Sequence, residues 1–285
     1  MRVLRVGQVG QERVAVLDED GQVRDGSAVV SRLDGAALEG GALEALRVAL
    51  GRGELPVLDG GAGLRVGPPV ERPGKVVCIG LNYRDHAEET GAATPTEPVV
   101  FLKDPYTVVG PDDQVLVPRG SVKTDYEVEL AVVIGRTARY VGTDDEALAC
   151  VAGYSVAHDV SERELQLERG GQWDKGKSCE TFNPLGPWLV TTDEVPDPQG
   201  LGLQLRVNGE LRQDGSTKSM IFGVAEIVRY LSQVMVLYPG DVINTGTPAG
   251  VALGQADPKP YLRSGDVVEC TIDGLGTQRQ TLVQA

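Results

Sequence analysis

The stretch from Thr124 to Ile134 constrains this fold more than any other, because two carboxylates lead directly into an apolar run. It predicts a strand, in which Glu127 and Glu129 share one face because strand side chains alternate between faces. Adjacent carboxylates repel each other and resist burial unless a cation or a proton neutralises them. A solvated face with two ordinary glutamates fits the pattern about as well as a metal site. The apolar run from Leu130 favours the metal site, because it sends the strand inward.

Oxygen ligands of this kind suit Mg²⁺, Mn²⁺ or Ca²⁺, so a third carboxylate is expected from another part of the chain. Asp159 is the best candidate, because it ends a second apolar run over residues 151–160. Its neighbour His158 should point to the opposite face, and we interpret it as structural.

Composition narrows the classes of function. The formal net charge of −14 argues against nucleic acid or an anionic membrane as the main partner. No apolar run reaches a membrane-spanning length, and no signal peptide is recognisable. The four cysteines are scattered without a CxxC pair, which predicts neither a disulfide framework nor a zinc site. We therefore expect a reducing, cytoplasmic compartment.

With 37 glycines and 17 prolines in 285 residues, turns are frequent, which favours a β-rich or mixed fold. We predict a small N-terminal α/β domain over residues 1–68, with a helix over residues 36–50. A Pro- and Gly-rich linker near residues 67–74 leads into a catalytic domain over residues 69–285. No candidate chemistry precedes the linker. Farther on, we predict a hairpin turning at Asn208-Gly209 and an amphipathic helix that begins near Val224.

His86 and Glu89 form a candidate acid/base pair. They follow a buried strand, in a predicted short helix that ends at Gly91, and their spacing of three places them on one helical face. A carboxylate beside an imidazole orients it and raises its basicity, as an acid/base dyad requires. An ordinary surface His–Glu pair is the alternative, and spacing alone favours it.

Three further segments carry candidate binding residues. Ser161 and Glu164 predict a capping box that opens a helix, with Arg163 and Gln166 on one face aimed back near Asp159. A solvated helix is the alternative. The segment 174–182 holds two lysines near aromatic residues, and one of them could hold a substrate carboxylate or enolate unless this is a surface loop. Glycines and threonines at residues 245–250 could offer backbone N–H groups and a hydroxyl to an anion.

With these residues in place, the chain resembles the fumarylacetoacetate hydrolase family. Matching stretches follow one another in order over residues 75–285, whereas the leading segment matches loosely. Within the family, the chain is most similar to bacterial hydrolases of 2,4-diketo-3-deoxy sugar acids. The stretches are IGLNYRDHAEE (79–89), DYEVELAVVIG (125–135), GYSVAHDVSERELQ (153–166), KGKSCETFNPLGPW (175–188), VNGELRQDGST (207–217) and PGDVINTGTPAGV (239–251).

The resemblance implies an α+β, β-rich fold with a mixed β-sandwich or β-roll catalytic domain, a divalent metal (Mg²⁺ or Mn²⁺) and a homodimer. It also assigns roles to individual residues. Cys179 departs from the family, in which many members have an aromatic residue there; it could reshape the pocket, and we do not interpret it as a nucleophile. The implied roles are metal ligation for Glu127, Glu129 and Asp159, acid/base catalysis for His86 and Glu89, enolate contact for Lys177, and substrate binding for Arg163, Gln166 and Thr247.

The reaction that the resemblance implies is hydrolysis of a carbon–carbon bond in an acylpyruvate, a 2,4-dioxo acid, to pyruvate and a carboxylic acid. Mg²⁺ would hold the 2-oxo acid end, while Glu89 and His86 would take a proton from the water that attacks C4. Oxaloacetate decarboxylation and 2-hydroxyhepta-2,4-diene-1,7-dioate isomerisation are alternatives on the same enolate chemistry. A metal-stabilised binding module is a third reading. The presence of both dyad residues favours hydrolysis.

Overall fold

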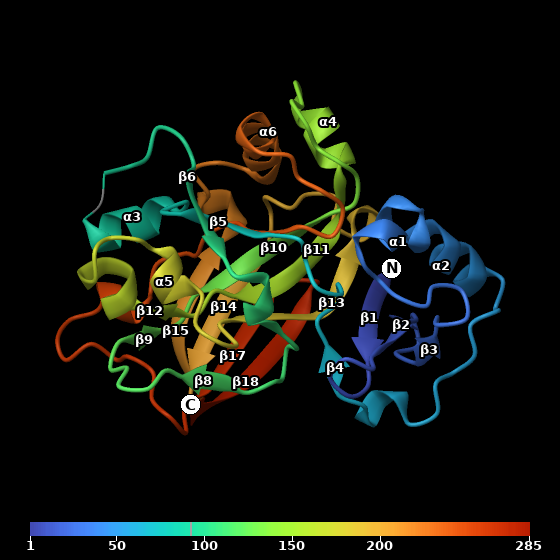
Figure 1. The fold of residues 1–285 in the computed structure, drawn as a ribbon, viewed down its shortest axis with the longest axis horizontal. Coiled ribbons are helices and arrows are strands. Elements are labelled where there is room, and N and C mark those ends of the chain that lie inside the picture. The colour runs from blue at the N-terminus through green and yellow to red at the C-terminus, as the bar shows by residue number, and fades with distance from the viewer. Residues whose placement is uncertain (92) are drawn as a thin grey trace.

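The computed structural model describes residues 1–91 and 93–285, which consist mostly of strands and loops with short helices (Figure 1). The strands are β1 (Arg2–Val6), β2 (Arg13–Leu17), β3 (Val23–Asp25), β4 (Val66–Gly67), β5 (Val76–Gly80), β6 (Val99–Lys103), β7 (Val108–Val109), β8 (Val115–Val117), β9 (Thr124–Asp125), β10 (Val128–Ile134), β11 (Val151–His158), β12 (Ser161–Glu162), β13 (Asn183–Thr191), β14 (Gly202–Val207), β15 (Glu210–Ser216), β16 (Val242–Asn244), β17 (Val267–Ile272) and β18 (Gly276–Gln284).

The α-helices are α1 (Gly35–Glu39), α2 (Ala42–Gly51), α3 (Arg84–Thr90), α4 (Asp144–Ala149), α5 (Asp174–Lys177) and α6 (Val224–Val234). A π-helical segment, η3, covers Glu164–Glu168, and a 3₁₀ turn, η6, covers Ala252–Gly254. Further 3₁₀ turns are η1 (Gly61–Gly63), η2 (Pro105–Thr107), η4 (Thr192–Glu194) and η5 (Thr217–Ser219). None of the helices within the described residues has the length and hydrophobicity that a membrane span requires.

The strand β10 lies in the middle of a large mixed sheet with the order β3-β2-β1-β13-β11-β10-β16-β5-β6. It pairs antiparallel with β11 on one side and with β16 on the other, so its backbone hydrogen bonds are satisfied within the sheet. Every residue of β10 is buried. The prediction that the apolar run sends this strand into the interior is therefore confirmed.

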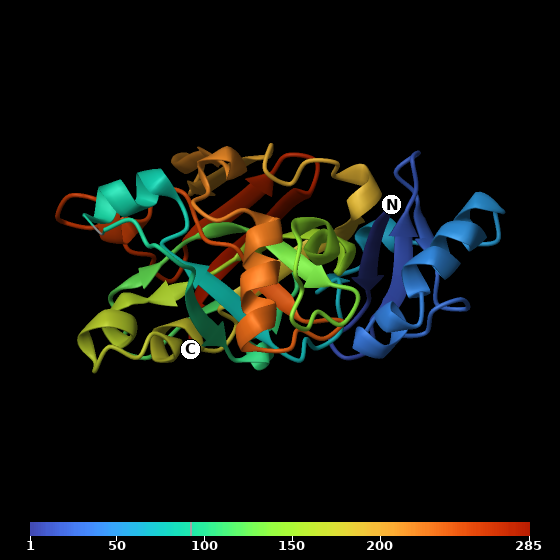
Figure 2. The same cartoon turned by 90° about the horizontal axis from the view of Figure 1, so that it is seen from above.

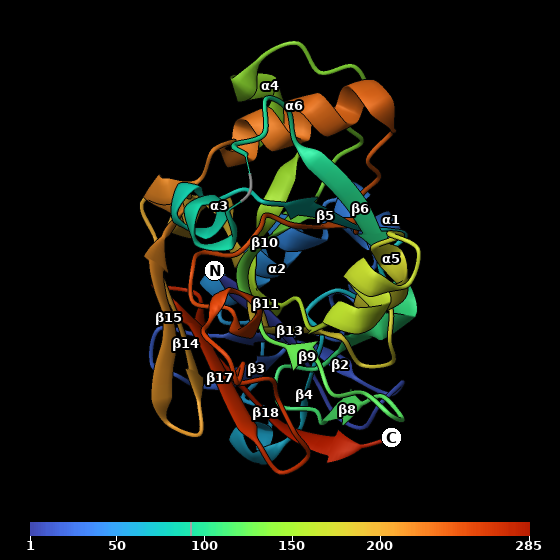
Figure 3. The same ribbon diagram turned by 90° about the vertical axis from the view of Figure 1, so that its left-hand side faces the viewer.

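A second sheet, ordered β15-β14-β17-β18-β8, packs against the strands β10, β11 and β13, and Figure 3 shows the two layers. Leu130 and Val132 of β10 pack into the cluster shared with this second sheet. Ala131 and Val133 instead pack on the opposite face, with residues of the N-terminal helices. The alternation of strand side chains thus separates two apolar layers around one strand, and the β-rich sandwich expected from the sequence is confirmed.

The N-terminal elements β1–β3, α1 and α2 lie together at one end of the molecule (Figures 1 and 2). Strand β1 continues the large sheet by pairing with β13, where Val3 is opposite Leu189. The core under α1 and α2 mixes Leu46 with Ala131 of β10. The leading segment is therefore joined to the rest of the chain through a sheet and a core, and the domain division at residues 68/69 stays a prediction.

Three predicted elements differ in the structure. The strand over residues 124–134 is two strands, β9 and β10, because β9 leaves the large sheet to pair with β12. The helix over residues 36–50 is two helices, because Gly40 caps α1 and Gly41 takes a left-handed φ of 85° before α2. Both glycines were visible in the sequence.

The capping box at Ser161 and Glu164 is also wrong. Ser161 lies in β12, and its hydroxyl donates to the carbonyl of Asp159 rather than accepting from a helix N–H. The segment that follows is the π-helical η3, which has no side-chain cap. The hairpin at Asn208-Gly209 and the helix α6 are formed as predicted.

Candidate active site

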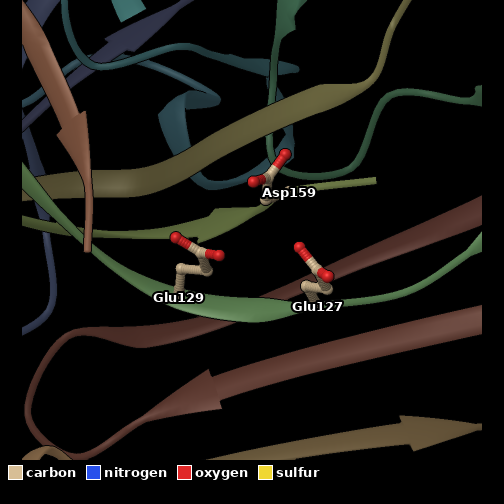
Figure 4. Close-up of side chains that lie close together, drawn as sticks. All are labelled: Glu127, Glu129 and Asp159. Carbon is tan, nitrogen blue, oxygen red and sulfur yellow. The ribbon is translucent and has the colours of Figure 1, made fainter. Parts of the chain in front are cut away.

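Three buried carboxylates converge where β10 begins and β11 ends (Figure 4). Glu129 is on β10, Glu127 is in the link from β9 to β10, and Asp159 directly follows β11. Each offers one oxygen, and these oxygens all lie within 4.8 Å of one another. The two glutamates approach from one stretch of the chain and Asp159 from another, as Figure 4 shows. The structure therefore brings together the three residues that the sequence analysis grouped as metal ligands.

Two buried lysines contact this triad. The Nζ of Lys177, at the end of α5, lies 2.5 Å from Glu127 Oε2 and 2.8 Å from Asp159 Oδ2. Lys103, at the end of β6, donates from Nζ to the other oxygen of Asp159 and, at 3.0 Å, to the carbonyl of Val160. Both carboxylate oxygens of Asp159 thus accept from an ammonium group, which fixes its orientation.

The electrostatics divide the two glutamates. Burial alone would raise the pKa of Glu127, but the charges of Lys177 and Arg163 outweigh it and lower that pKa to about 2. Burial and the charges of Asp159 and Glu127 raise the pKa of Glu129 well above its usual value, although it accepts a 2.7 Å hydrogen bond from Gly246 N–H. Glu129 therefore experiences charge repulsion that a bound cation would relieve.

The three carboxylates fit a divalent metal ion on the chemistry of the donor set. All three ligand candidates are hard oxygens, and none of the four cysteines or His158 is among them. Such a set is typical of Mg²⁺, Mn²⁺ or Ca²⁺ and untypical of zinc. The raised pKa of Glu129 supports the same assignment, since the charge of Lys177 does not offset burial and the repulsion from Asp159 and Glu127.

The helix α3 carries the candidate acid/base pair. The sequence predicted a short helix stopped by Gly91, and Gly91 does cap α3 in a left-handed conformation. His86 Nδ1 lies 3.5 Å from Glu89 Oε2, and His86 is buried. Both oxygens of Glu89 also accept from the backbone N–H of Gly250, so the carboxylate is anchored to the segment after β16. The pair is therefore oriented, with His86 buried and Glu89 partly buried, rather than an ordinary surface pair.

Arg163 and Gln166 are buried and contact each other, with Nη1 of Arg163 donating to Oε1 of Gln166 at 2.9 Å. Arg163 also donates to Glu127 at 2.6 Å and to Asp125 at 2.8 Å. A buried guanidinium held by two carboxylates excludes the solvated-helix reading of this segment. The guanidinium of Arg163 forms its ion pairs with Glu127 and Asp125 rather than with Asp159.

Thr247 follows β16, and its hydroxyl donates to the carbonyl of Val128 at 2.8 Å while accepting from Nε2 of Gln213. The neighbouring Gly246 gives its N–H to Glu129. Only glycine fits there, because φ is 96° and a Cβ would come within 2.8 Å of Asn82 Cβ. This segment therefore supports the carboxylate triad through backbone and hydroxyl contacts.

The environments of His158 and Cys179 agree with the absence of a catalytic role for either residue. His158 is fully buried, its Nδ1 is 3.0 Å from Gln280 Oε1, and burial lowers its pKa to about 4, so it is neutral. Burial raises the pKa of Cys179 to about 11, which disfavours the thiolate that a nucleophile requires. Cys179 packs at the edge of the main core and is not among the residues that line the cavity described next.

One cavity of about 250 Å³ brings these groups together. Glu89 and Asp159 are not among the residues that line it. Its polar and charged lining residues are His86, Glu127, Glu129, Arg163, Gln166, Lys177 and Thr247. Lining residues therefore come from α3, β10, η3, α5 and the segment after β16. A cavity of this volume fits a small molecule rather than a polymer.

Sequence analysis missed two charged residues of this site, Lys103 and Asp125. Lys103 is 2% exposed, and its only local signal is a lysine that ends an apolar strand. Asp125 is fully buried and accepts from Arg163 and from the N–H groups of Ala252 and Leu253, so it ties η6 to the centre. Both partners are distant in sequence, which is why no spacing rule indicates them.

The fold and this site define a β-rich enzyme with an oxygen-only acidic centre beside a His–Glu pair. Residues 75–283 match the sequence profile of the fumarylacetoacetate (FAA) hydrolase C-terminal domain. The chain belongs to the fumarylacetoacetate hydrolase family. A curated relative from Burkholderia ambifaria, described as "putative hydrolase", is 53% identical over 281 residues, covering 99% of this chain and 98% of the relative.

Solved structures agree over the full length of this chain. Fumarylacetoacetate hydrolase from Exiguobacterium antarcticum is 38% identical with a TM-score of 0.86, and the alignment covers 100% of both chains. A probable 2-hydroxyhepta-2,4-diene-1,7-dioate isomerase from Mycobacterium abscessus is 37% identical, with a TM-score of 0.82 and 99% of that chain covered. Maleylpyruvate hydrolase from Sphingobium sp. SYK-6, in complex with manganese(II) and pyruvate, is 29% identical, with a TM-score of 0.80 and 100% of both chains covered.

These findings confirm the family, the fold and an enzymatic activity in keeping with hydrolases of carbon–carbon bonds. A divalent metal is supported by the family, by the manganese complex of the Sphingobium relative and by the acidic triad. The catalytic and binding roles of individual residues stay predictions.

Lys103→Met should destabilise the metal-free protein. It leaves Asp159 buried with one of its two ammonium partners, and breaking a buried ion pair costs about 3–5 kcal/mol. We expect a loss near 3 kcal/mol, because Lys177 still contacts Asp159. Urea unfolding in the presence of a chelator measures it. Lys123→Met, which removes a half-exposed partner of Glu168, is the control and should change stability little. Equal stabilities of Lys103→Met and wild type would contradict the structural role.

A second prediction concerns pH. The raised pKa of Glu129 favours the protonated carboxyl in the folded state. Its stabilising contribution is therefore complete below the unfolded-state pKa and is lost as pH rises toward the folded-state value. Metal-free wild type should lose stability relative to Glu129→Gln, which mimics the protonated form, as pH rises from about 4.3, the ordinary glutamate pKa, through the neutral range. Unfolding midpoints across this range measure the difference, and parallel profiles for the two proteins would refute it.

Proposed function

We propose that this chain is a divalent-metal-dependent hydrolase that cleaves the C3–C4 bond of an acylpyruvate to give pyruvate and a carboxylic acid. The observation that carries the proposal is the convergence of His86, Lys177 and the two glutamates of the triad on one cavity. Hydrolysis of such a bond needs an activated water and stabilisation of a pyruvate enolate. The cavity offers a group for each task.

Glu127, Glu129 and Asp159 would hold the metal, which we propose to be Mg²⁺, with Mn²⁺ as the alternative that a relative's complex supports. When bound, the ion would supply Lewis-acid polarisation and a fixed seat for the 2-oxo acid end. Arg163 and Gln166 line the same cavity and would orient the substrate, together with Thr247. The amide of Gln166 suits a carboxylate, because its oxygen already accepts from Arg163 and its N–H₂ group can donate.

The imidazole of His86 would take a proton from water, with Glu89 behind it orienting the ring. The resulting hydroxide adds to C4, and the C3–C4 bonding electrons pass to C3 to form the pyruvate enolate. Lys177 would stabilise that enolate by its charge. Burial would lower the pKa of Lys177, but Asp159 and Glu127 outweigh burial and raise it, so the ammonium persists at neutral pH. The proton held on His86 is then available to protonate C3.

Oxaloacetate decarboxylation and diene-dioate isomerisation are the competing reactions, and a relative described as an isomerase favours the second. Neither needs a water to attack carbon. A 2,4-diketo-3-deoxy sugar acid is one candidate acylpyruvate. We also propose a homodimer, as the family resemblance implies, to be checked by sedimentation. The cysteines, all free, agree with a reducing, cytoplasmic setting.

Pyruvate release with and without Mg²⁺, from acetylpyruvate and from oxaloacetate, tests the reaction class. We expect metal-dependent pyruvate from acetylpyruvate. Glu129→Ala should abolish this turnover while the fold, checked by circular dichroism, is retained. Full activity of that variant in excess chelator would contradict a carboxylate-held metal.

Dyad variants separate the two chemistries. His86→Ala and Glu89→Ala should each lower acylpyruvate hydrolysis by about 10²–10⁴-fold, the usual contribution of general acid–base catalysis. Any oxaloacetate decarboxylation should change much less, whereas Lys177→Ala should impair both reactions, because both pass through the enolate. Rates of the two reactions are measured side by side with metal occupancy checked. Equal losses in both reactions for His86→Ala would show that the dyad does not activate water.

A further inference from the structure

The part of the cavity that the reaction groups leave uncovered is apolar. Six large apolar side chains complete its lining, and they come from β5 and the residue after it, β6, η3, the start of α5 and η6. A wall of this size would contact the substrate beyond its 2-oxo acid end, which is where an acylpyruvate carries its acyl group. The six residues are Ile79, Leu81, Phe101, Leu167, Trp173 and Leu253.

The permanent cations of the cavity are already paired with carboxylates. Among the described residues that line it, these cations are Lys177 and Arg163. Lys177 contacts Glu127 and Asp159, and Arg163 contacts Asp125 and Glu127. Each already faces two carboxylates, so neither is set aside for a carboxylate at the far end of a substrate.

The apolar wall is built in contact with the reaction groups. Lys177 Nζ lies 5.1 Å from the centroid of the Phe101 ring, and Phe101 packs edge-on against Trp173 with centroids 5.5 Å apart. The indole of Trp173 packs directly against Gly80. A side chain at residue 80 would clash with it, because a Cβ there would lie 2.5 Å from Trp173 Cζ3. The wall therefore begins beside the ammonium proposed to stabilise the enolate.

Leu81 supports a functional origin for this wall. Its φ of 53° is in the left-handed region, which is rare for a bulky side chain and accumulates at functional sites. The leucine nevertheless lines the cavity. A glycine or asparagine would adopt this backbone at lower cost, so the fold alone does not account for a leucine here.

We propose that the acyl group of the substrate is uncharged and apolar, an alkyl or aryl group. The chain would thus prefer monocarboxylate acylpyruvates over those with a second carboxylate or a polyhydroxy tail. An alkyl group gains by leaving water for the wall, whereas a carboxylate or hydroxyl there would lose water without a partner. This inference rests on the proposed function and specifies its substrate class.

A matched pair of substrates tests the inference. Butanoylpyruvate and succinylpyruvate have acyl chains of equal length that end in a methyl group and in a carboxylate, respectively. With Mg²⁺, kcat/KM should be at least tenfold higher for butanoylpyruvate. Equal values, or a preference for succinylpyruvate, would overturn the apolar assignment while leaving acylpyruvate hydrolysis in place. Release of pyruvate from neither substrate would overturn the proposed function, and this inference with it.

A charge introduced at the cavity mouth provides the reciprocal test. Leu167 lines the cavity yet is 42% exposed, so substitutions there should fold. Leu167→Arg should raise the succinylpyruvate/butanoylpyruvate ratio of kcat/KM at least fivefold relative to Leu167→Gln, the uncharged control. An unchanged ratio would mean that the acyl group does not reach this wall, and would count against the proposal.

Binding provides a readout that does not depend on turnover. In His86→Ala, where hydrolysis is expected to be slow, calorimetric titration should show tighter binding of butanoylpyruvate than of succinylpyruvate by a similar factor. Leu81→Asn should weaken butanoylpyruvate binding while leaving the thermal midpoint equal or higher, because it relieves the left-handed strain. Loss of both affinity and thermal stability would assign Leu81 to the fold rather than to the substrate.

Discussion

The candidate active site depends on a group of buried carboxylates that come from several different segments of the chain. When all four are ionised, Asp125, Glu127, Glu129 and Asp159 face three cations, Lys103, Lys177 and Arg163, which leaves one negative charge in excess. Buried charges without partners cost several kcal/mol each. Removing any one of the three cations should therefore destabilise the fold. A divalent cation would turn the excess to one positive charge, which the single carboxylate of a monoanionic substrate can neutralise. The charge balance and the apolar wall therefore support the same substrate class.

The sheet explains how distant segments meet at this point. Pairing between β10 and β11 sets Glu129 opposite Ala157, so the end of β11 delivers Asp159 beside the two glutamates. Parallel pairing of β5 with β16 and antiparallel pairing with β6 bring Lys103 to the same region. The lysine of α5 and the arginine before η3 are then added from segments that follow β11. A shift of β10 by one residue in its pairing register would turn Glu129 to the opposite face of the sheet. The carboxylate group would then no longer form.

Local patterns predicted the parts of the site that local geometry determines. The alternation rule paired Glu127 with Glu129 even though the predicted strand is broken between β9 and β10, and the end of an apolar run located Asp159. The Ser161–Glu164 capping box failed because β12 pairs with β9, a non-local contact that overrides a weak helix-start signal. Lys103 and Asp125 escaped prediction for the same reason: their partners are set by tertiary structure, and a lone lysine or aspartate in a strand has no distinguishing pattern. The two glycines between α1 and α2 indicate a helix break. The prediction of one helix over residues 36–50 gave more weight to the helical spacing of the leucines.

The separation between charge group and dyad bears on how one fold can serve several reactions. His86 and Glu89 belong to α3, and Glu89 is fastened to Gly250 and packed against Gly254 of η6, outside the carboxylate group. Asp125 links the two parts structurally, because it accepts from the first two N–H groups of η6 and also from Arg163. The proposed enolate-stabilising group could therefore stay constant while the position of the proposed water-activating pair changes with α3 and η6. In this chain η6 also supplies Leu253 to the apolar wall, so the element that anchors the dyad would also contact the proposed acyl group. A substrate that fills this wall would press on the same element that positions His86, and its fit would be expressed in kcat as well as in KM.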